Sequence, residues 1–383
     1  METRSFTSIG REISLLGFGL MRLPLADPGK PEIDYSLGEK MIDLAWRSGV
    51  NYFDTAWPYH DGLSELFAGA VLSRYPRESY CLASKMPLWA LDSAERAEEI
   101  FNRQLEKCRV DYFDFYLLHS LTEEHYKIAL DFDIYNLLAR KKQQGLIKRL
   151  GFSFHDNPGL LARIVSAHSW DFAQIQLNYI DWQALEAKRQ YEILAQRQIP
   201  VVIMEPVRGG ALATLNPQAL NILQNADPGA SPASWALRYA GSLPGVLTVL
   251  SGMSDLEQVK DNIATMEQFK PLSNGERDLL AQAGSAYLAS GVIPCTNCRY
   301  CMDCPSGVNI PRVFAVYNHY RTIDNSFAPA IFANNYRTLG PSEQAHNCTG
   351  CDRCLEYCPQ SINIPEQMRT IAALSPAPQP LEL

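Results

Sequence analysis

The chain has 383 residues, of which 46% are hydrophobic and 20% charged, and its formal net charge at pH 7 is −8. This length suits one large domain plus a small one, and the composition is that of an ordinary globular protein. An acidic chain is a poor partner for nucleic acid or an anionic membrane, both of which attract basic surfaces. The sequence has no signal-peptide pattern at its start and no run of about 18 or more apolar residues, so it predicts a cytoplasmic protein that does not span a membrane.

Short apolar segments alternate with helical patterns through about the first 270 residues. The eight segments that resemble strands lie at 14–23, 51–56, 80–85, 113–119, 147–154, 172–178, 199–206 and 245–252. The clearest helical pattern covers 93–110, where Ile100, Leu105 and Cys108 follow a possible cap at Ser93. Strands this apolar indicate a parallel sheet that is buried on both faces. Eight such units predict a (β/α)8 barrel, and no G-x-G-x-x-G motif follows an early strand as a Rossmann domain requires.

The segment GVIP at 291–294 marks a predicted domain boundary. We expect a barrel over 1–290 and a small domain over 291–383, and the small domain holds eight of the ten cysteines. The other two, Cys81 and Cys108, lie in a predicted strand and a predicted helix and are interpreted as core residues.

Polar side chains lie at the predicted ends of three successive strands. Asp54 and Tyr59 are in the segment FDTAWPYHDG, Lys85 is in LASKMP, and His119 is in FYLLHS. Because the active sites of (β/α)8 barrels lie at the carboxyl ends of the strands, we expect these side chains to meet there. A single histidine at such a position is more often structural, so the prediction rests on the four residues together.

The motifs DTAxxY, the Ser-Lys pair after the third strand, DYFDFYLLHS and GFS resemble those of the aldo-keto reductase family. The resemblance covers about the first 270 residues and fills all four positions of the family's catalytic tetrad, with Asp54, Tyr59, Lys85 and His119. It implies an oxidoreductase that reduces a carbonyl substrate with NADPH or NADH, bound in extended form without a Rossmann fold.

The chemistry of carbonyl reduction suits these four side chains. Delivery of a hydride to the carbonyl carbon leaves an alkoxide that must gain a proton, and a tyrosine with a pKa near 10 needs a nearby cation to become an effective acid. We expect Tyr59 to donate the proton, Lys85 to be that cation, and Asp54 to hold it. His119 is expected to orient the carbonyl oxygen and to share the proton path.

The resemblance also implies where the nucleotide binds. Ser153 and Gln174 are expected to bind the nicotinamide carboxamide, and the family's usual asparagine after that serine is Phe154 here. The segment EPVRGGAL at 205–212 is expected to lie along the pyrophosphate, with Arg208 and the backbone of Gly209 as donors. The alternative is that this segment is only a tight Gly-Gly turn after the seventh strand.

The segment SGMSDLEQVKDNIAT, at the end of the eighth predicted strand, resembles the family's adenosine-binding segment. Its candidate contacts are Gln258, Asp261 and Asn262. The basic residues that commonly hold the 2′-phosphate of NADPH are absent, because Gln258 and Gly252 stand in their places. An amide has no charge with which to replace an arginine fork, so the choice between NADP and NAD stays open.

Tryptophans follow the predicted second, third and sixth strands. Trp57, Trp89 and Trp182 are candidates to line a substrate pocket. Packing against the barrel is an equally good interpretation of all three.

Two cysteine runs follow the barrel, and each ends in Cys-Pro. The first run consists of Cys295, Cys298, Cys301 and Cys304, and the second of Cys348, Cys351, Cys354 and Cys358. The second run matches C-x2-C-x2-C-x3-C-P, a signature of bacterial two-cluster ferredoxins, in which three cysteines bind one 4Fe-4S cluster and the fourth binds the other. The resemblance therefore implies one cluster on Cys295, Cys298, Cys301 and Cys358 and a second on Cys348, Cys351, Cys354 and Cys304.

The first run departs from this signature, because only two residues separate Cys301 from Cys304, and the crossover of Cys304 stays open. Zinc is the rival metal, since C-x2-C pairs also form zinc sites. A zinc site leaves the third close cysteine of each run and the Cys-Pro ends unexplained. Between the runs, residues 317–339 indicate an aromatic-rich helix.

Three functional interpretations follow. The first is a nicotinamide-dependent carbonyl reductase whose two 4Fe-4S clusters transfer electrons to or from a ferredoxin, another electron carrier or a bound flavin, since a barrel can bind flavin phosphate without an obvious signature. The second is an iron–sulfur electron-transfer protein with the barrel as a scaffold, which the complete tetrad disfavours. The third is a reductase whose clusters are purely structural.

Overall fold

The structure is a computed structural model that describes residues 1–27, 30 and 32–375. It divides into two compact units, Met1–Val207 with Ala233–Ser273 and Arg208–Pro232 with Asn274–Leu383. These units describe packing, and the domain division between residues 290 and 291 stays a sequence-based prediction.

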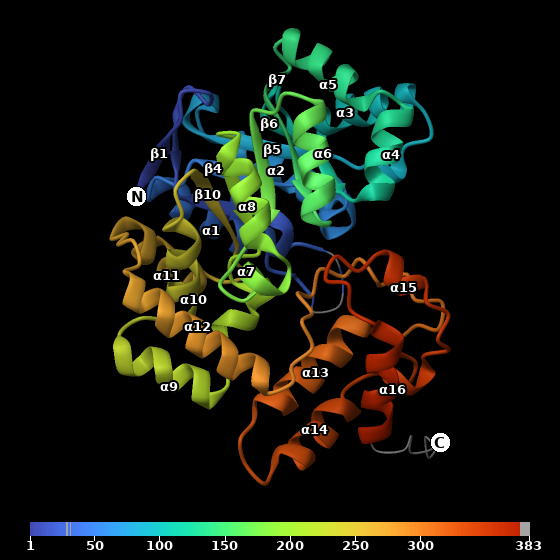
Figure 1. Cartoon of the computed structure of the whole chain (residues 1–383). Coiled ribbons are helices and arrows are strands. Elements are labelled where there is room, and N and C mark those ends of the chain that lie inside the picture. Colours follow the sequence, from blue (N-terminus) through green and yellow to red (C-terminus); the bar gives the residue numbers. More distant parts are fainter. Residues whose placement is uncertain (28–29, 31, 376–383) are drawn as a thin grey trace. The chain divides into compact units, whose positions relative to one another are not determined.

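Eight parallel strands of the first unit form a closed barrel, which confirms the predicted fold class (Figure 1). In chain order they are β3 (Leu16–Gly19), β4 (Tyr52–Asp54), β5 (Cys81–Met86), β6 (Phe113–Leu121), β7 (Ile147–Phe154), β8 (Phe172–Gln176), β9 (Val201–Met204) and β10 (Val246–Gly252). The barrel closes because β10 pairs with both β9 and β3. Strands buried on both faces are apolar along nearly their whole length, which is why the sequence shows all eight.

Helices follow the strands and surround the barrel, as expected for alternating β and α segments (Figure 1). They are α1 (Tyr35–Arg47), α2 (Leu63–Leu72), α3 (Ala94–Cys108), α4 (Glu123–Asp131), α5 (Ile134–Gln143), α6 (Pro158–Ala167), α7 (Asp181–Ala184), α8 (Ala187–Gln196), α10 (Pro232–Gly241) and α11 (Leu256–Glu267). Ser93 caps α3 as the sequence indicates, because its side chain accepts a hydrogen bond from the backbone N–H of Arg96. Among the described residues, no helix is both long and apolar enough to cross a bilayer.

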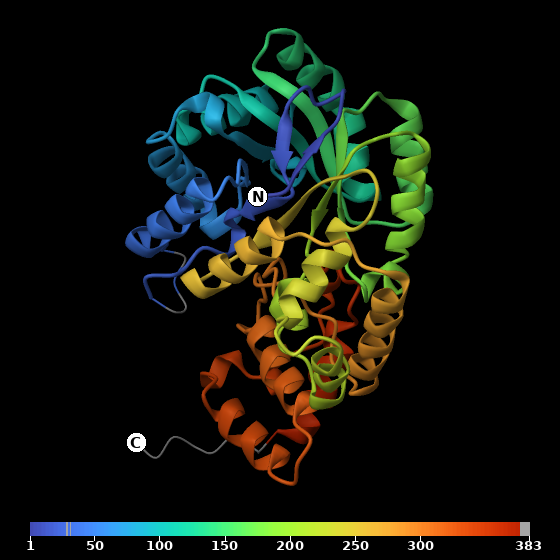
Figure 2. The same ribbon diagram turned by 90° about the vertical axis from the view of Figure 1, so that its left-hand side faces the viewer.

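A short antiparallel hairpin precedes the barrel, and the sequence does not predict it. It consists of β1 (Thr3–Ser5) and β2 (Glu12–Ser14), the segment beside the N label in Figure 2. Ile9 and Ile13 pack in one cluster with Tyr52, Cys81 and Phe115 of the barrel strands. Cys81 is therefore a core residue, as predicted.

The second unit contains a turn and two helices that follow barrel elements in sequence, and then the cysteine-rich module. Its elements are η5 (Arg208–Ala213), α9 (Pro217–Ala226), α12 (Asn274–Ala289), α13 (Ile310–Thr322), α14 (Ala328–Arg337), α15 (Arg353–Glu356) and α16 (Ile364–Leu374). The side chain of Asn216, which caps α9, also donates a hydrogen bond to the carbonyl of Ala286 in α12 at 3.0 Å.

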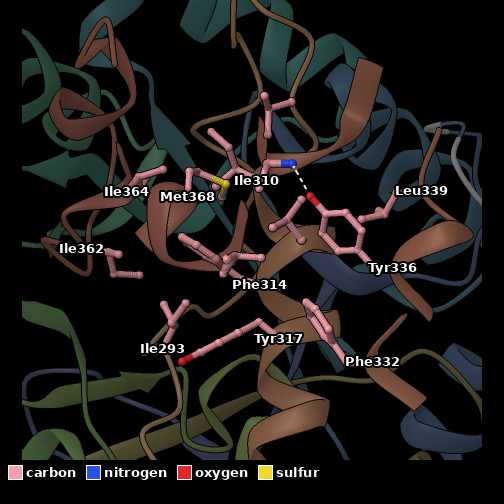
Figure 3. Packing of buried hydrophobic residues seen from close by; sticks show 14 residues of the cluster. Ile293, Ile310, Phe314, Tyr317, Phe332, Tyr336, Leu339, Ile362, Ile364 and Met368 are labelled. Carbon is pink, nitrogen blue, oxygen red and sulfur yellow. Dashed lines mark hydrogen bonds between the residues drawn. The ribbon is translucent and has the colours of Figure 1, made fainter. Parts of the chain in front are cut away.

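Aromatic side chains build the core of the module. Figure 3 shows Phe314 and Tyr317 of α13 beside Phe332 and Tyr336 of α14. The hydroxyl of Tyr336 accepts a hydrogen bond of 2.7 Å from the backbone N–H of Ala345, which fixes the chain just before the second cysteine run (Figure 3). The aromatic-rich helix expected over 317–339 is thus two helices, α13 and α14, rather than one.

Candidate functional site

The four tetrad candidates lie at the carboxyl ends of neighbouring strands. Asp54 is the last residue of β4, Lys85 lies in β5 and His119 lies in β6. Tyr59 opens the short turn η2 (Tyr59–Gly62) that follows β4. All four side chains are buried, and Lys85 is 0% exposed.

The ammonium group of Lys85 lies at the centre of this cluster. Its Nζ is 2.5 Å from Asp54 Oδ1, 2.8 Å from the carbonyl oxygen of Thr55 and 3.4 Å from Tyr59 Oη. Burial lowers the pKa of Lys85, and the carboxylate of Asp54 opposes that shift. Burial raises the pKa of Asp54, and Lys85 opposes that shift in turn. An ammonium has three N–H donors and here each has an acceptor, so the geometry fits a charged lysine.

The surroundings of His119 favour the neutral imidazole. Burial first, and then the positive charge of Lys85, lower the pKa of His119 well below its usual range. Its ring lies edge-on to Tyr59, with 6.0 Å between ring centroids, and 5.0 Å from the indole of Trp89. Its Nδ1 is buried and has no hydrogen-bond partner among the described residues. A neutral imidazole has one N–H, which can donate to a carbonyl oxygen.

Ser153 and Gln174 are partners in the register of β7 and β8. The backbone N–H of Ser120 donates a 2.7 Å hydrogen bond to Ser153 Oγ. Gln174 is 2% exposed, its Nε2 lies 3.5 Å from the sulfur of Met204, and its Oε1 has no partner in the described part of the chain. A buried amide oxygen without a donor suits a ligand that carries an N–H, such as a carboxamide.

The three candidates on α11 have different surroundings. Gln258 is exposed and completes the helix cap. Its backbone N–H donates to the side chain of Asp255, and its Oε1 accepts from the backbone N–H of Ser254. Asn262 is buried and donates a 2.7 Å hydrogen bond to Ser251 Oγ at the end of β10. Asp261 is half-buried.

The eight cysteines of the two runs line two cavities in the module. One is lined by Cys295, Cys298, Cys301 and Cys358. The other is lined by Cys304, Cys348, Cys351 and Cys354, and Cys301 borders it as well. The first cavity thus brings together three cysteines of the first run and one of the second. The second brings together three cysteines of the second run with Cys304 and Cys301 of the first. Apart from the shared Cys301, this is the grouping that the ferredoxin resemblance implies.

The electrostatics of the thiols follow the same grouping. Burial, and then the sulfurs of Cys298, Cys295 and Cys358, raise the pKa of Cys301. Burial is also the main cause that raises the pKa of Cys354 to about 11, and Cys348, Cys304 and Cys351 add to it. A bound metal would supply the positive charge that favours the thiolate form of these groups.

A bound cluster and a single metal ion make different demands on the cysteines. A zinc ion needs its ligands to converge on one point, and among the residues that the structure describes no group of three or more histidine, cysteine, aspartate or glutamate side chains forms such a site. A 4Fe-4S cluster would take one thiolate on each of its four irons.

Comparison with known families covers most of the chain. The model of the aldo/keto reductase family matches residues 15–283, and that of a 4Fe-4S dicluster domain matches residues 294–363. The chain belongs to the aldo/keto reductase family. Both parts of the sequence-based recognition, the barrel family and the C-terminal iron–sulfur domain, are confirmed.

The relatives of this aldo/keto reductase are oxidoreductases. It is 25% identical over 294 residues to the uncharacterized oxidoreductase YqkF of Bacillus subtilis, which covers 69% of this chain and 90% of YqkF. It is 24% identical over 304 residues to L-galactose dehydrogenase of Arabidopsis thaliana, which covers 73% of this chain and 92% of that enzyme. The holo form of the aldo-keto reductase AKR11C1 from Bacillus halodurans is similar in structure, with a TM-score of 0.61, 25% identity, and coverage of 74% of this chain and 96% of that one.

Sequence reasoning missed Arg22, which lies in the turn η1 (Leu20–Arg22) after β3. A β-carbon on Gly252 would lie 3.1 Å from both Cγ and Cδ of Arg22. The Arg22 guanidinium donates to Glu205 Oε1 at 3.0 Å, and the other oxygen of Glu205 is buried without a hydrogen-bond partner among the described residues. The absent side chain of Gly252 therefore makes room for a cation from the turn after β3. The basic residue directly after GFGLM is the only sequence signal for it.

Arg208 and Gly209 are described within the second unit. Arg208 is buried, and its positive charge opposes the burial that raises the pKa of Tyr287 in α12. Gly209 has φ of 65°, and a β-carbon there would lie 2.1 Å from the carbonyl oxygen of Thr296, the residue after Cys295. The sequence motif RGG thus has a packing role beside the first cysteine run, which the sequence does not reveal.

The three tryptophans have different contacts. Trp89, in the turn η4 (Leu88–Ala90), is 41% exposed and lies between the rings of His119 and His125. The ring of Trp57 faces the ammonium of Lys107 at 4.0 Å. Trp182 packs against two tyrosines, Tyr191 and Tyr239. Among the described residues, Trp89 is the one of the three whose ring lies against the ring of a tetrad residue, His119.

Proposed function

We propose that this aldo/keto reductase reduces a carbonyl substrate by hydride transfer from NADH or NADPH, and that its module carries two 4Fe-4S clusters for electron transfer. The observation that carries the enzymatic part is the contact of buried Lys85 with both the Asp54 carboxylate and the Tyr59 hydroxyl. The same contact argues against a barrel that is only a scaffold. Burying an ion pair costs desolvation free energy that the attraction between the charges need not repay, so stability alone does not explain this pair.

A bound nicotinamide would supply the hydride. Tyr59 would donate its proton to the carbonyl oxygen, and the ammonium of Lys85 would stabilise the phenolate that remains. Asp54 would keep Lys85 in place and charged. Neutral His119 would donate a hydrogen bond to the same carbonyl oxygen, with Trp89 beside it to exclude water.

For the nucleotide, we propose that Ser153 and Gln174 bind the carboxamide, and that Gln258, Asp261 and Asn262 lie at the adenosine. The buried Oε1 of Gln174, which has no hydrogen-bond donor among the described residues, supports the first of these assignments. The assignment of Arg208 and Gly209 to the pyrophosphate rests on the sequence resemblance alone.

The catalytic assignment is tested with Tyr59→Phe and the control Tyr75→Phe, whose hydroxyl contacts Asp43 on the outer helix α1. A general acid contributes about 10²–10⁴ in rate. We expect Tyr59→Phe to lose about this much of its rate toward the best carbonyl substrate and to keep its affinity for the nucleotide. A Tyr59→Phe enzyme as fast as the control would refute the assignment.

We propose that Cys295, Cys298, Cys301 and Cys358 hold one cluster and that Cys304, Cys348, Cys351 and Cys354 hold the other. Protein purified without oxygen should be brown and contain about eight irons and eight sulfides per chain. Stoichiometric zinc with little iron would refute this proposal. Such thiolate sites persist in a reducing compartment, which fits a cytoplasmic protein.

A role of the clusters in electron transfer is supported by the exposure of Cys351, since a ligand at the surface leaves its cluster accessible to a partner. Nicotinamide gives up two electrons as a hydride, whereas a 4Fe-4S cluster takes one at a time. We propose that the clusters exchange electrons with a bound flavin or with an outside carrier such as a ferredoxin, and do not take them directly from NADH or NADPH. If the clusters are purely structural, their absorbance will stay constant while the enzyme turns over its carbonyl substrate.

A further inference from the structure

We infer that Glu65, a residue outside the tetrad, is a positioning residue that holds Lys85 and the Tyr59 turn in their reactive arrangement. This inference rests on the proposed roles of Lys85 and Tyr59. Glu65 lies in α2, directly after the turn η2 that carries Tyr59. Its side chain is completely buried, and burial of a carboxylate is costly unless hydrogen bonds and opposite charges compensate it.

One oxygen of Glu65 is tied to the strand that carries Lys85. Glu65 Oε1 accepts hydrogen bonds from Ser84 Oγ at 2.8 Å and from Gln104 Nε2 at 2.6 Å. Ser84 is the neighbour of Lys85 in β5, and because side chains alternate along a strand it points to the opposite face. Gln104 Nε2 also lies 3.0 Å from the carbonyl oxygen of Lys85, and its Oε1 accepts from Tyr116 at 2.5 Å. Glu65 therefore fixes the backbone of β5 on the side away from the substrate.

The other oxygen of Glu65 is tied to the turn that carries Tyr59. Lys107 Nζ of α3 lies 3.3 Å from Glu65 Oε2, 3.5 Å from the carbonyl oxygen of Gly62 and 4.0 Å from the ring of Trp57. The turn η2 needs such support, because His60 and Asp61 both have positive φ, of 51° and 52°. One carboxylate thus connects the lysine and the tyrosine of the tetrad through two separate sets of contacts.

The charge of Glu65 also acts on its surroundings. Burial lowers the pKa of Lys85, and the carboxylates of Asp54 and Glu65 oppose this. The groups that face Glu65 are Lys85 from β5, Lys107 and Cys108 from α3, and Tyr116 from β6. Only the two lysines among them are cations. Loss of the Glu65 charge should therefore lower the pKa of Lys85. By Coulomb's law, removing this nearby negative charge also favours the phenolate of Tyr59, and removing the positive charge of Lys107 disfavours it.

The test is the titration of Tyr59, measured as the phenolate absorbance of each variant minus that of the same variant with Tyr59→Phe. It needs neither substrate nor nucleotide. We expect Glu65→Gln to move the Tyr59 titration to lower pH and Lys107→Gln to move it to higher pH, with the double variant close to the wild type. Glu106→Gln, an exposed residue of the same helix α3 as Lys107, is the matched control and should change nothing.

Kinetics supply a second readout. Glu65→Gln should lower kcat by about tenfold or more, because the turn that carries Tyr59 loses its support and the proton donor leaves its reactive position, while KM changes little. If both single variants fold and titrate as the wild type does, Glu65 has no positioning role. If Glu65→Gln fails to fold, the direction of the Lys107→Gln shift decides. A wild-type rate in Tyr59→Phe would instead refute the proposed function, whatever the Glu65 titration shows.

Discussion

Gly209 lies so close to Thr296 that a β-carbon on the glycine would come within 2.1 Å of the threonine carbonyl oxygen. Gly209 belongs to the turn η5, whereas Thr296 follows Cys295, so the contact joins segments that are far apart in the sequence. The next residue, Gly210, also has positive φ, of 94°, but a β-carbon there would meet nothing within 4 Å. The two glycines therefore form a matched pair that differs in this one contact.

The first prediction uses this pair. Gly210→Ala should cost only the strain of a left-handed backbone, about 1–2 kcal/mol. Gly209→Ala should cost about 1–3 kcal/mol more, because the added methyl displaces the backbone beside Cys295. The temperature at which the cluster absorbance is lost should therefore be lower for Gly209→Ala than for Gly210→Ala. Equal temperatures would mean that the turn η5 does not support the module.

The second prediction concerns the protonation of His119. Because burial and the Lys85 charge hold its pKa well below the usual range, His119 should stay neutral across the working range of the enzyme. The pH profile of kcat/KM should then show no step near the ordinary histidine pKa of about 6.5. His119→Asn keeps an N–H donor and cannot titrate, so it should lower the rate and leave the shape of the acid side unchanged. A step near that pH that disappears in His119→Asn would show a titrating histidine.

The third prediction concerns nucleotide choice. Arg22 fills the space that Gly252 leaves, and the carboxylate of Glu205 neutralises the charge of Arg22. The wild-type enzyme should therefore discriminate between NADPH and NADH by less than about a hundredfold, or nearly 3 kcal/mol. Glu205→Gln frees the guanidinium for a 2′-phosphate and should raise the affinity for NADPH relative to NADH by about tenfold. Dissociation constants for both nucleotides check this, with Glu257→Gln on the exposed face of α11 as the control. An unchanged ratio in Glu205→Gln would exclude Arg22 as the phosphate-binding residue.

Local sequence was sufficient to predict the barrel. Each of its strands is an apolar segment of its own, and the cap of α3 at Ser93 needs only its own helix. The sequence did not predict the hairpin β1–β2, because its second strand runs directly into the apolar segment of β3. The break between α13 and α14 was not predicted either, although Pro329 near the start of α14 indicates it.

The site was predictable only where a motif carried it. Asp54, Tyr59, Lys85 and His119 stand in recognisable motifs, and the structure brings them together at one end of the barrel. Arg22 and Glu205 are 183 residues apart and meet only because β3 and β9 are both neighbours of β10. Glu65 and Gln104 likewise meet only when α2 and α3 pack together, so no local sequence pattern indicates their contact.

The central claim is that the barrel transfers a hydride from the nicotinamide to a carbonyl carbon. The direct measurement is the fate of deuterium from NADH or NADPH labelled at the transferable position, followed in anaerobic protein with its best carbonyl substrate. The account predicts one deuterium on the former carbonyl carbon for each nucleotide oxidised, with this transfer lost in Tyr59→Phe. Oxidation of the nucleotide with no deuterium in the product, and with electrons appearing in the clusters instead, would contradict it.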